Sequence, residues 1–217
     1  MIIMNPRGRP ARALLVLLAL VSCSWGLAAP GPDAGPACTC ATARLDNGWC
    51  EAHAVGWVAG VEIHSRLLYD AMDAHGHTLD LTTFTCESCR KAIDTDGFCP
   101  LHHIGFVHKQ AWFSRLTYEL ARGEKRDAGA IACPRCRKNA ASLGWCDKDH
   151  IGMVGSVAIH DRPAYDQAVA AVRILQEAVR TTARCELCAL AMVTDTRCPW
   201  CKITYKNGKP VAQPAGR

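Results

Sequence analysis

The sequence predicts an α+β fold built from four small tandem units, and three observations support this prediction. A pattern of closely spaced cysteines occurs four times, and its third cysteines lie 49, 47 and 52 residues apart. The first three units share further residues at fixed positions, and each has apolar residues at helical spacing after its cysteines. A sequence that repeats at this length is typical of an array of similar units.

The cysteine pattern predicts that each unit binds a metal ion. A close pair of cysteines is followed by nine residues, a third cysteine, and a His or Cys three or four residues later. Four nitrogen and sulfur groups in two short clusters are what tetrahedral Zn²⁺ binds, so we predict about four zinc ions per chain. The predicted ligands are Cys38, Cys40, Cys50 and His53; Cys86, Cys89, Cys99 and His102; Cys133, Cys136, Cys146 and His150; and Cys185, Cys188, Cys198 and Cys201.

The fourth ligand is ambiguous in two units. In the second unit, His102 aligns with His53 and His103 aligns with His150, and we favour His102. In the third unit, Asp149 aligns with His53. We favour His150 there, because sulfur-rich structural zinc sites take imidazole more readily than carboxylate.

The number of cysteines favours metal over disulfides. Of the 14 cysteines, Cys23 lies near the start and the other 13 divide into three groups of three and one group of four. A disulfide framework would leave one of the 13 unpaired. Disulfides remain the alternative, because the export argued below would place the chain where they form. Iron or copper can replace zinc at individual sites, since thiolates bind all three metals.

Each of the first three units is predicted to contain two cysteine knuckles, a hairpin, a strand and an amphipathic helix. The nine residues after the cysteine pair are expected to form the hairpin, and an apolar extended stretch such as 55–63 to form the strand. The longest helix is predicted over 162–180. A Ser or Asp occupies the predicted N-cap of each helix: Ser65, Ser114 and Asp161.

The fourth unit is shorter than the others and is predicted to act as a terminal cap. No helical pattern follows its cysteines. Instead, Asn207-Gly208 predicts the turn of a β-hairpin.

The first three units also share residues that are not predicted ligands. An aromatic residue precedes each third cysteine, a glycine lies six residues after it, and an Arg and a Tyr follow the N-cap: Trp49, Gly56, Arg66 and Tyr69; Phe98, Gly105, Arg115 and Tyr118; and Trp145, Gly152, Arg162 and Tyr165. We expect each Tyr to pack against its own unit and each aromatic residue before the cysteine to shield the thiolates from water.

The last unit has the spacing C-x2-C-x9-C-x2-C and resembles the short zinc ribbons found singly or in pairs in many proteins, whose usual pattern is CPxCG…FCxxCG. Cys133-Pro134-Arg135-Cys136 and Phe98-Cys99-Pro100 carry the same resemblance. It covers about 17 residues in each unit and leaves the helices out. The chain departs from the pattern where His replaces the last Cys and where Arg90, Arg137 and Ala189 replace Gly.

Residues 1–22 have the features of an export signal. Three arginines and no acidic residue precede an apolar run over 13–21 that is too short to be a good membrane span. Leu20-Val21-Ser22-Cys23 resembles a bacterial lipobox, which implies cleavage before Cys23 and a lipid on its sulfur. Cleavage near Ala28 or Ala29 is the alternative. Residues 23–37 then form a flexible tether, and the units run over 38–85, 86–132, 133–184 and 185–217.

Charge and site chemistry favour a role that is neither catalytic nor nucleic-acid binding. Without residues 1–22 the chain keeps 22 basic and 20 acidic side chains, and such a balance gives no strongly basic face for nucleic acid. Four protein ligands per site also leave no open coordination position of the kind that catalytic zinc uses. We therefore expect no enzyme.

Three functions follow as hypotheses. The leading one is a zinc-binding, membrane-anchored bacterial protein, held at the outer membrane and facing the periplasm, that acts as a structural and interaction module for a protein partner. The alternative is periplasmic metal handling, meaning buffering or delivery of zinc, copper or a toxic soft metal. The short Cys38-Thr39-Cys40 spacing and the extra His103 support it. The lesser alternative is thiol–disulfide redox activity, suggested by Cys198-Pro199-Trp200-Cys201.

Overall fold

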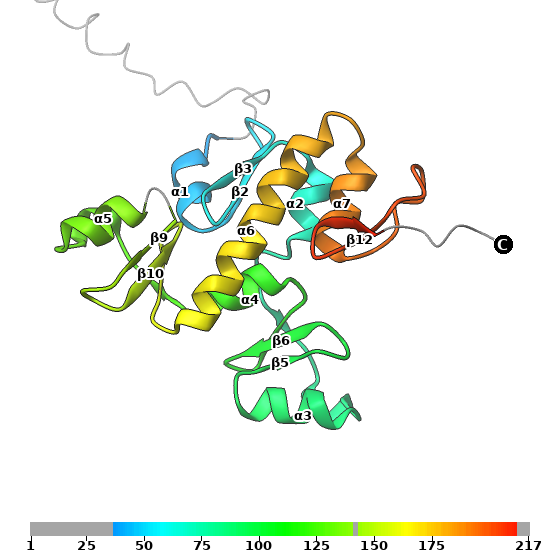
Figure 1. Cartoon of the computed structure of the whole chain (residues 1–217), viewed down its shortest axis with the longest axis horizontal. Coiled ribbons are helices and arrows are strands. Elements are labelled where there is room, and N and C mark those ends of the chain that lie inside the picture. Colours follow the sequence, from blue (N-terminus) through cyan, green and yellow to red (C-terminus); the bar gives the residue numbers. More distant parts are fainter. Residues whose placement is uncertain (1–36, 141–142, 212–217) are drawn as a thin grey trace, which may run out of the picture. The chain divides into compact units, whose positions relative to one another are not determined.

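The first three units fold alike, each as a short helix, a strand that carries the third cysteine, a β-hairpin and a second helix (Figure 1). The structure is a computed structural model that describes residues 37–140 and 143–211, which belong to one compact unit. The predicted α+β class is confirmed. The predicted export segment 1–22, Cys23 and the tether up to residue 36 lie outside the described residues.

The elements follow one another in the same order in each unit. The first unit contains α1 (Cys40–Leu45), β1 (Trp49–Cys50), β2 (Val55–Val58), β3 (Val61–Ile63) and α2 (Arg66–Ala71). The second contains α3 (Glu87–Asp94), β5 (Phe98–Cys99), β6 (Ile104–Val107), β7 (Gln110–Trp112) and α4 (Arg115–Ala121). The third contains α5 (Pro134–Ala140), β9 (Gly144–Cys146), β10 (Ile151–Val154), β11 (Val157–Ile159) and α6 (Arg162–Thr182). The fourth keeps α7 (Glu186–Thr194), β12 (Thr204–Lys206) and β13 (Lys209–Val211).

The residues between the cysteine pair and the third cysteine form a helix, where the sequence predicted a hairpin. In the second unit α3 ends at Asp94, and the chain turns through Asp96, whose φ is 48°. The Gly97 N–H then donates to the Ala92 carbonyl at 2.7 Å. This bond is typical of a helix that ends in a left-handed residue. The chain therefore reverses through a helix cap rather than through a β-turn.

The β-hairpins lie after the third cysteine instead. Ala59 and Gly60, between β2 and β3, have φ values of 53° and 78°. Asn207 and Gly208 have φ values of 51° and 71°, and they join β12 to β13. Two consecutive residues with positive φ are what a type I′ turn requires. The predicted Asn-Gly hairpin at the end of the fourth unit is confirmed.

The first two of the three inter-unit linkers each add a strand to the sheet of the next unit. The linkers contain β4 (His77–Thr78) with η1 (Leu81–Thr83), and β8 (Glu124–Lys125) with η2 (Ala128–Ala130). β4 pairs with β7 in a sheet of order β4-β7-β6-β5, and β8 pairs with β11 in a sheet of order β8-β11-β10-β9. These strands precede the sequence boundaries at 85 and 132, so the first and second units each supply the edge strand of the unit after it.

The predicted N-caps precede the second helices. Ser65 Oγ accepts a hydrogen bond from Leu68 N at 2.9 Å, and Asp161 Oδ2 accepts one from Ala164 N at 2.8 Å. Ser114 takes the same position without such a bond. The helix predicted over 162–180 is α6, which extends to residue 182.

The shared Arg, aromatic residue and Tyr form one stack in each unit. The ring centroids lie 5.2 Å apart for Trp49–Tyr69, 5.4 Å for Phe98–Tyr118 and 5.3 Å for Trp145–Tyr165. The Arg115 guanidinium lies 4.3 Å from the Phe98 centroid, and Arg66 and Arg162 lie similarly. Each Tyr therefore packs against its own unit, as the sequence predicted, and its partner there is the aromatic residue beside the third cysteine.

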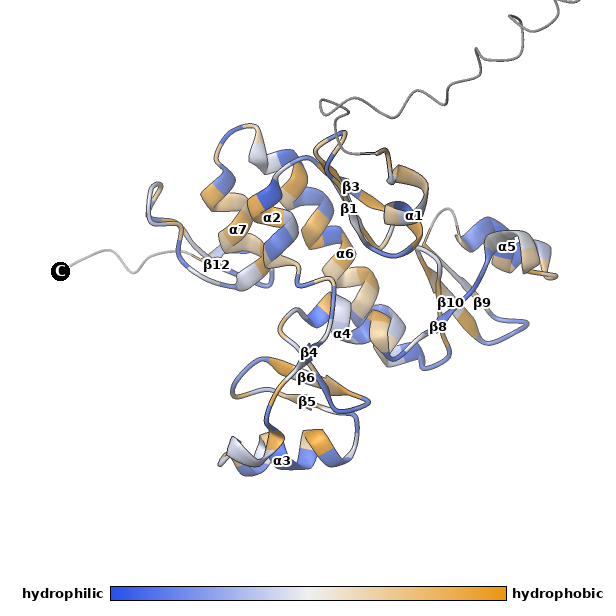
Figure 2. Cartoon of the chain, turned by 180° about the vertical axis from the view of Figure 1, so that it is seen from behind, coloured by the Kyte–Doolittle hydropathy of each residue, from blue (hydrophilic) through white to orange (hydrophobic). Residues whose placement is uncertain are grey.

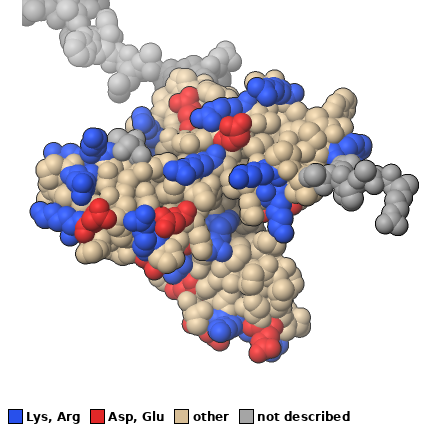
Figure 3. Space-filling view, in the orientation of Figure 1, with Lys and Arg blue, Asp and Glu red and all other residues tan. Residues whose placement is uncertain are grey.

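The largest hydrophobic cluster takes residues from all four units. Ile63, Leu116, Leu175 and Ala189 come from one unit each and are fully buried in it. α6 packs against both α4 and α7, and the hydrophobic stretches of these helices are visible in Figure 2. On the face drawn in Figure 3, basic and acidic side chains are interspersed. None of the described helices is long and apolar enough to span a membrane.

Candidate metal centres

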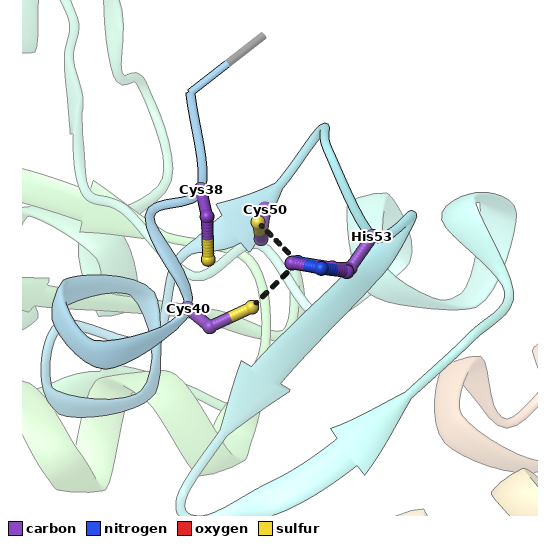
Figure 4. A group of neighbouring side chains, drawn as sticks. All are labelled: Cys38, Cys40, Cys50 and His53. Carbon is purple, nitrogen blue, oxygen red and sulfur yellow. Dashed lines mark hydrogen bonds between the residues drawn. The ribbon is translucent and has the colours of Figure 1, made fainter. Parts of the chain in front are cut away.

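Each unit brings four ligand groups together. The groups are site one (Cys38, Cys40, Cys50 and His53), site two (Cys86, Cys89, Cys99 and His102), site three (Cys133, Cys136, Cys146 and Asp149) and site four (Cys185, Cys188, Cys198 and Cys201). Within each site, the ligand atoms all lie within 4.8 Å of one another. Figure 4 shows the four side chains of site one pointing toward a common centre.

Site two illustrates how local structure places the ligands, and site four repeats it with Cys185 as the N-cap of α7, whereas in site one Thr39 is the N-cap and Cys40 begins α1. Cys86 is the N-cap of α3 and Cys89 lies in its first turn. Cys99 ends β5, and His102 lies three residues later, before β6 begins. The start of α3 therefore positions the first pair of ligands, and the turn after β5 positions the second pair.

The distances within the sites match tetrahedral zinc. With bonds of about 2.3 Å to sulfur and about 2.0 Å to nitrogen or oxygen, tetrahedral ligand atoms lie about 3.5–3.8 Å apart. In site two, His102 Nδ1 lies 3.3 Å from Cys89 Sγ and 3.6 Å from Cys99 Sγ. In site four, Cys185 Sγ lies 3.9 Å from Cys198 Sγ and 3.7 Å from Cys201 Sγ. The donor set and its spacing therefore fit the ion that the sequence predicted.

The geometry does not match the disulfide alternative. All 13 cysteines of the described part of the chain carry free thiols. The sulfur separations of 3.7–3.9 Å in site four are far longer than a disulfide bond of about 2.05 Å. Cys198 and Cys201, the pair that suggested redox activity, lie together with the other cysteine pair of site four.

The thiols of one site cannot all ionise without a cation. A hydrogen bond from Thr39 N, helped by His53, lowers the pKa of Cys50 to about 5 against the opposing effect of burial. Burial and the neighbouring thiol Cys50 raise the pKa of Cys40 to about 12. Like charges this close disfavour one another. A divalent cation removes this conflict, because it lets all three cysteines bind as thiolates.

Fifteen of the 16 predicted ligands belong to these four sites, and His150 is the exception. Its place in site three is taken by Asp149, whose Oδ2 lies 3.1 Å from Cys136 Sγ and 3.6 Å from Cys146 Sγ. His150 is exposed and has a φ of 52°. The turn after the third cysteine directs its third residue inward and the next one outward, so the prediction of His150 is corrected to Asp149.

The same turn separates the two histidines of the second unit. His102 belongs to site two, whereas His103 has a φ of 54° and places its ring against Phe98, with centroids 6.5 Å apart. His102, which the sequence favoured over His103, is thus the histidine that lies with the cysteines of site two.

Two supporting residues were missed by the sequence reasoning. Arg90 Nε donates to the Phe84 carbonyl at 3.0 Å, and Arg137 Nε donates to the Ile131 carbonyl at 3.2 Å. Each Arg therefore fixes the segment that leads into its cysteine pair. The signal was visible as an Arg directly after C-x2-C in two units, at the position where zinc ribbons usually have Gly.

The four sites can hold cations through protein groups alone, since each supplies four ligand atoms. Comparisons of the chain with protein families, with curated proteins and with solved structures find no match. The metal-binding conclusion therefore rests on the four clusters themselves, in which short Cys-rich knuckles repeat four times with donor sets that suit zinc.

Proposed function

We propose that this chain is a zinc-binding, non-enzymatic structural and interaction module. The observation that carries the proposal is that every site offers four protein ligand atoms. Zinc with four protein ligands has no position left for a substrate or a reactive water. The metal then acts as a cross-link that holds each unit in its fold. The binding function is carried out by the protein surface that these cross-links stabilise.

The small size of the local cores supports this role. Around site two the buried cluster consists of Cys89, Ala92, Cys99, Phe106 and Ala111, and two of these five residues are ligands. A cluster this small buries too little apolar surface to order a unit alone. Metal binding supplies the missing free energy in small domains of this kind.

Two exposed apolar side chains, one beside site two and one beside site four, are separate candidate contact points for a protein partner. Leu101 and Trp200 each lie two residues after a third cysteine, and they are 72% and 81% exposed. Both stand on turns that the ligands on either side hold in place. Rigid, exposed aromatic and aliphatic side chains are the usual anchors of protein interfaces. The interspersed charges of Figure 3 favour a protein partner over nucleic acid.

We also propose that this module is exported and anchored to a membrane by a lipid on Cys23. The support comes from the arginine-rich start, the apolar run over 13–21 and the lipobox-like Leu20–Cys23. Labelling of cells with a radioactive fatty acid tests this part. We expect the full-length chain to incorporate label and the Cys23→Ala variant to incorporate none, and equal labelling would contradict lipidation.

Metal analysis of the purified full chain tests the central proposal. We expect about four zinc ions per chain by elemental mass spectrometry, with thiols that stay masked until a strong chelator also unfolds the protein. The circular dichroism signal and the thiol titration are expected to change together. Absence of bound metal with few free thiols would contradict the proposal and favour disulfides.

A further inference from the structure

Site three differs from the other three sites in its ligand chemistry. Its fourth group is the Asp149 carboxylate, whereas the other sites complete three cysteines with an imidazole or a fourth thiol. Zinc in a sulfur-rich environment is held more firmly by soft or borderline ligands than by a hard carboxylate oxygen. Of the ligands in the four sites, Asp149 is therefore the one that the sulfur of an external thiol would displace from zinc most readily.

A cavity of about 280 Å³ lies directly against this site. Its wall includes the ligands Cys133, Cys136 and Asp149 and the apolar residues Ile151 and Met153. A cavity of this size admits a small molecule. A ligand within it can reach the metal-binding groups without unfolding of the unit.

The cysteines of site three lie outside the hydrophobic clusters that the described residues form. Cysteines of sites one, two and four each belong to a hydrophobic cluster. Cys136 and Cys146 are buried, but they belong to none of the three clusters that the described residues form. A ligand that is not part of a larger apolar cluster can rearrange locally without disrupting that cluster.

We infer that site three is a zinc-exchange site, in which a small external thiol enters the cavity and displaces the Asp149 carboxylate. In this step a sulfur–zinc bond forms, the zinc–oxygen bond to Asp149 breaks, and the proton of the thiol passes to water. No group is oxidised or reduced. The inference rests on the zinc-binding part of the proposed function, and it gives one site a dynamic role beside three that act as fixed cross-links.

Zinc transfer to a chromophoric chelator tests the inference on the full chain. With 2-mercaptoethanol present, we expect a fast phase of about one zinc in four, whose rate rises with the thiol concentration. Ethylene glycol, which replaces the sulfur with oxygen, is expected to leave the rate unchanged. A single slow phase for all four ions, unaffected by thiol, would overturn the inference.

Two variants separate the roles of the carboxylate and the cavity. Asp149→His gives site three the ligand set of site two, and we expect it to lose the fast phase while it still binds four zinc ions. Ala130→Phe changes an exposed residue of the cavity wall and leaves all ligands intact, so it should retain zinc but lose the response to thiol. A fast phase that persists in both variants would contradict the inference.

Cadmium NMR gives a readout that does not depend on release rates. In the ¹¹³Cd-substituted chain, the resonance of site three should differ from those of the sites that end in His or Cys. It should move toward the all-sulfur resonance of site four when thiol is added. If four ions bind but no resonance moves, only this inference fails. If no ion binds, the proposed function itself fails.

Discussion

Tyr118 lies so close to Gly105 that a Cβ on the glycine would stand 2.1 Å from Tyr118 Cδ2. The same contact recurs between Gly56 and Tyr69 and between Gly152 and Tyr165. Gly105 belongs to β6 and Tyr118 to α4, so the contact sets how closely the second helix approaches the hairpin. The Tyr118 hydroxyl also donates to the Asp96 carbonyl at 3.0 Å, which ties the helix to the turn before Phe98.

We expect Gly105→Ala to destabilise the zinc-loaded protein by about 1–3 kcal/mol, since overpacking of this kind costs that much. Gly129→Ala is the matched control, because a Cβ there meets nothing nearer than 3.5 Å. Urea denaturation measures both free energies of unfolding. Equal effects of the two substitutions would show that the contact with Tyr118 does not constrain the fold.

This contact illustrates what the sequence can and cannot predict. The repeated pattern picked out the Gly, the Arg, the aromatic residue and the Tyr, because each recurs at a fixed offset from the third cysteine. It did not show that they form a single stack. Residues 105 and 118 meet only because the hairpin folds the chain back, and that reversal depends on the turn at 108–109, where two residues have positive φ.

The fourth ligand shows where chemical preference misled. The sequence favoured His150 because imidazole suits zinc, although the fourth ligand of sites one, two and four lies three residues after the third cysteine. The turn has a fixed length, and the residue that follows the fourth ligand has a positive φ in every unit: Ala54, His103, His150 and Lys202. Backbone geometry therefore decides which side chain reaches the site.

The nine residues between the cysteine pair and the third cysteine were also predicted wrongly, as a hairpin instead of a helix. A spacing of nine residues fits a capped helix as well as a hairpin, so the spacing alone did not distinguish the two structures.

The C-terminal hairpin depends on a glycine for both its turn and its packing. Gly208 has a φ of 71°, and a Cβ there would lie 2.7 Å from Ile174 Cγ1 on α6. Gly60→Ala is a matched comparison, because Gly60 has a φ of 78° but a Cβ there would meet only Gly155 Cα, at 3.8 Å. We expect about 1 kcal/mol of destabilisation for Gly60→Ala from backbone strain alone. Gly208→Ala should cost more, as measured by thermal unfolding, and an equal cost would mean that the hairpin does not pack against α6.

Glu119 gives the stability a defined pH dependence. Its side chain is fully buried and lies 2.7 Å from Arg115 and 3.3 Å from Arg122. Burial raises the pKa of Glu119 above its ordinary value of 4.5, although both arginines lower it. A carboxyl group with a raised pKa in the folded state stabilises most when protonated. Its contribution is complete below pH 4.5 and is lost as the pH rises through the folded-state pKa.

Glu119→Gln tests this dependence, because Gln has a similar shape and does not ionise. We expect the free energy of unfolding of the Gln variant, relative to wild type, to increase as the pH rises above 4.5. Urea denaturation of both zinc-saturated proteins over a pH series measures the difference, in which loss of zinc at low pH largely cancels. A difference that stays constant with pH would contradict a raised pKa at Glu119.

Neighbouring residues in site three test the register of the fourth ligand. We expect Asp149→Ala to weaken zinc binding at one site, so that about three ions remain after dialysis against a weak chelator. His150→Ala should retain about four, because the equivalent residue of the first unit is already an alanine, Ala54, with a φ of 47°. The second unit offers an independent copy of the same test, in which His102→Ala should lose zinc and His103→Ala should keep it. If His150→Ala released the ion and Asp149→Ala did not, His150 rather than Asp149 would be the fourth ligand of site three.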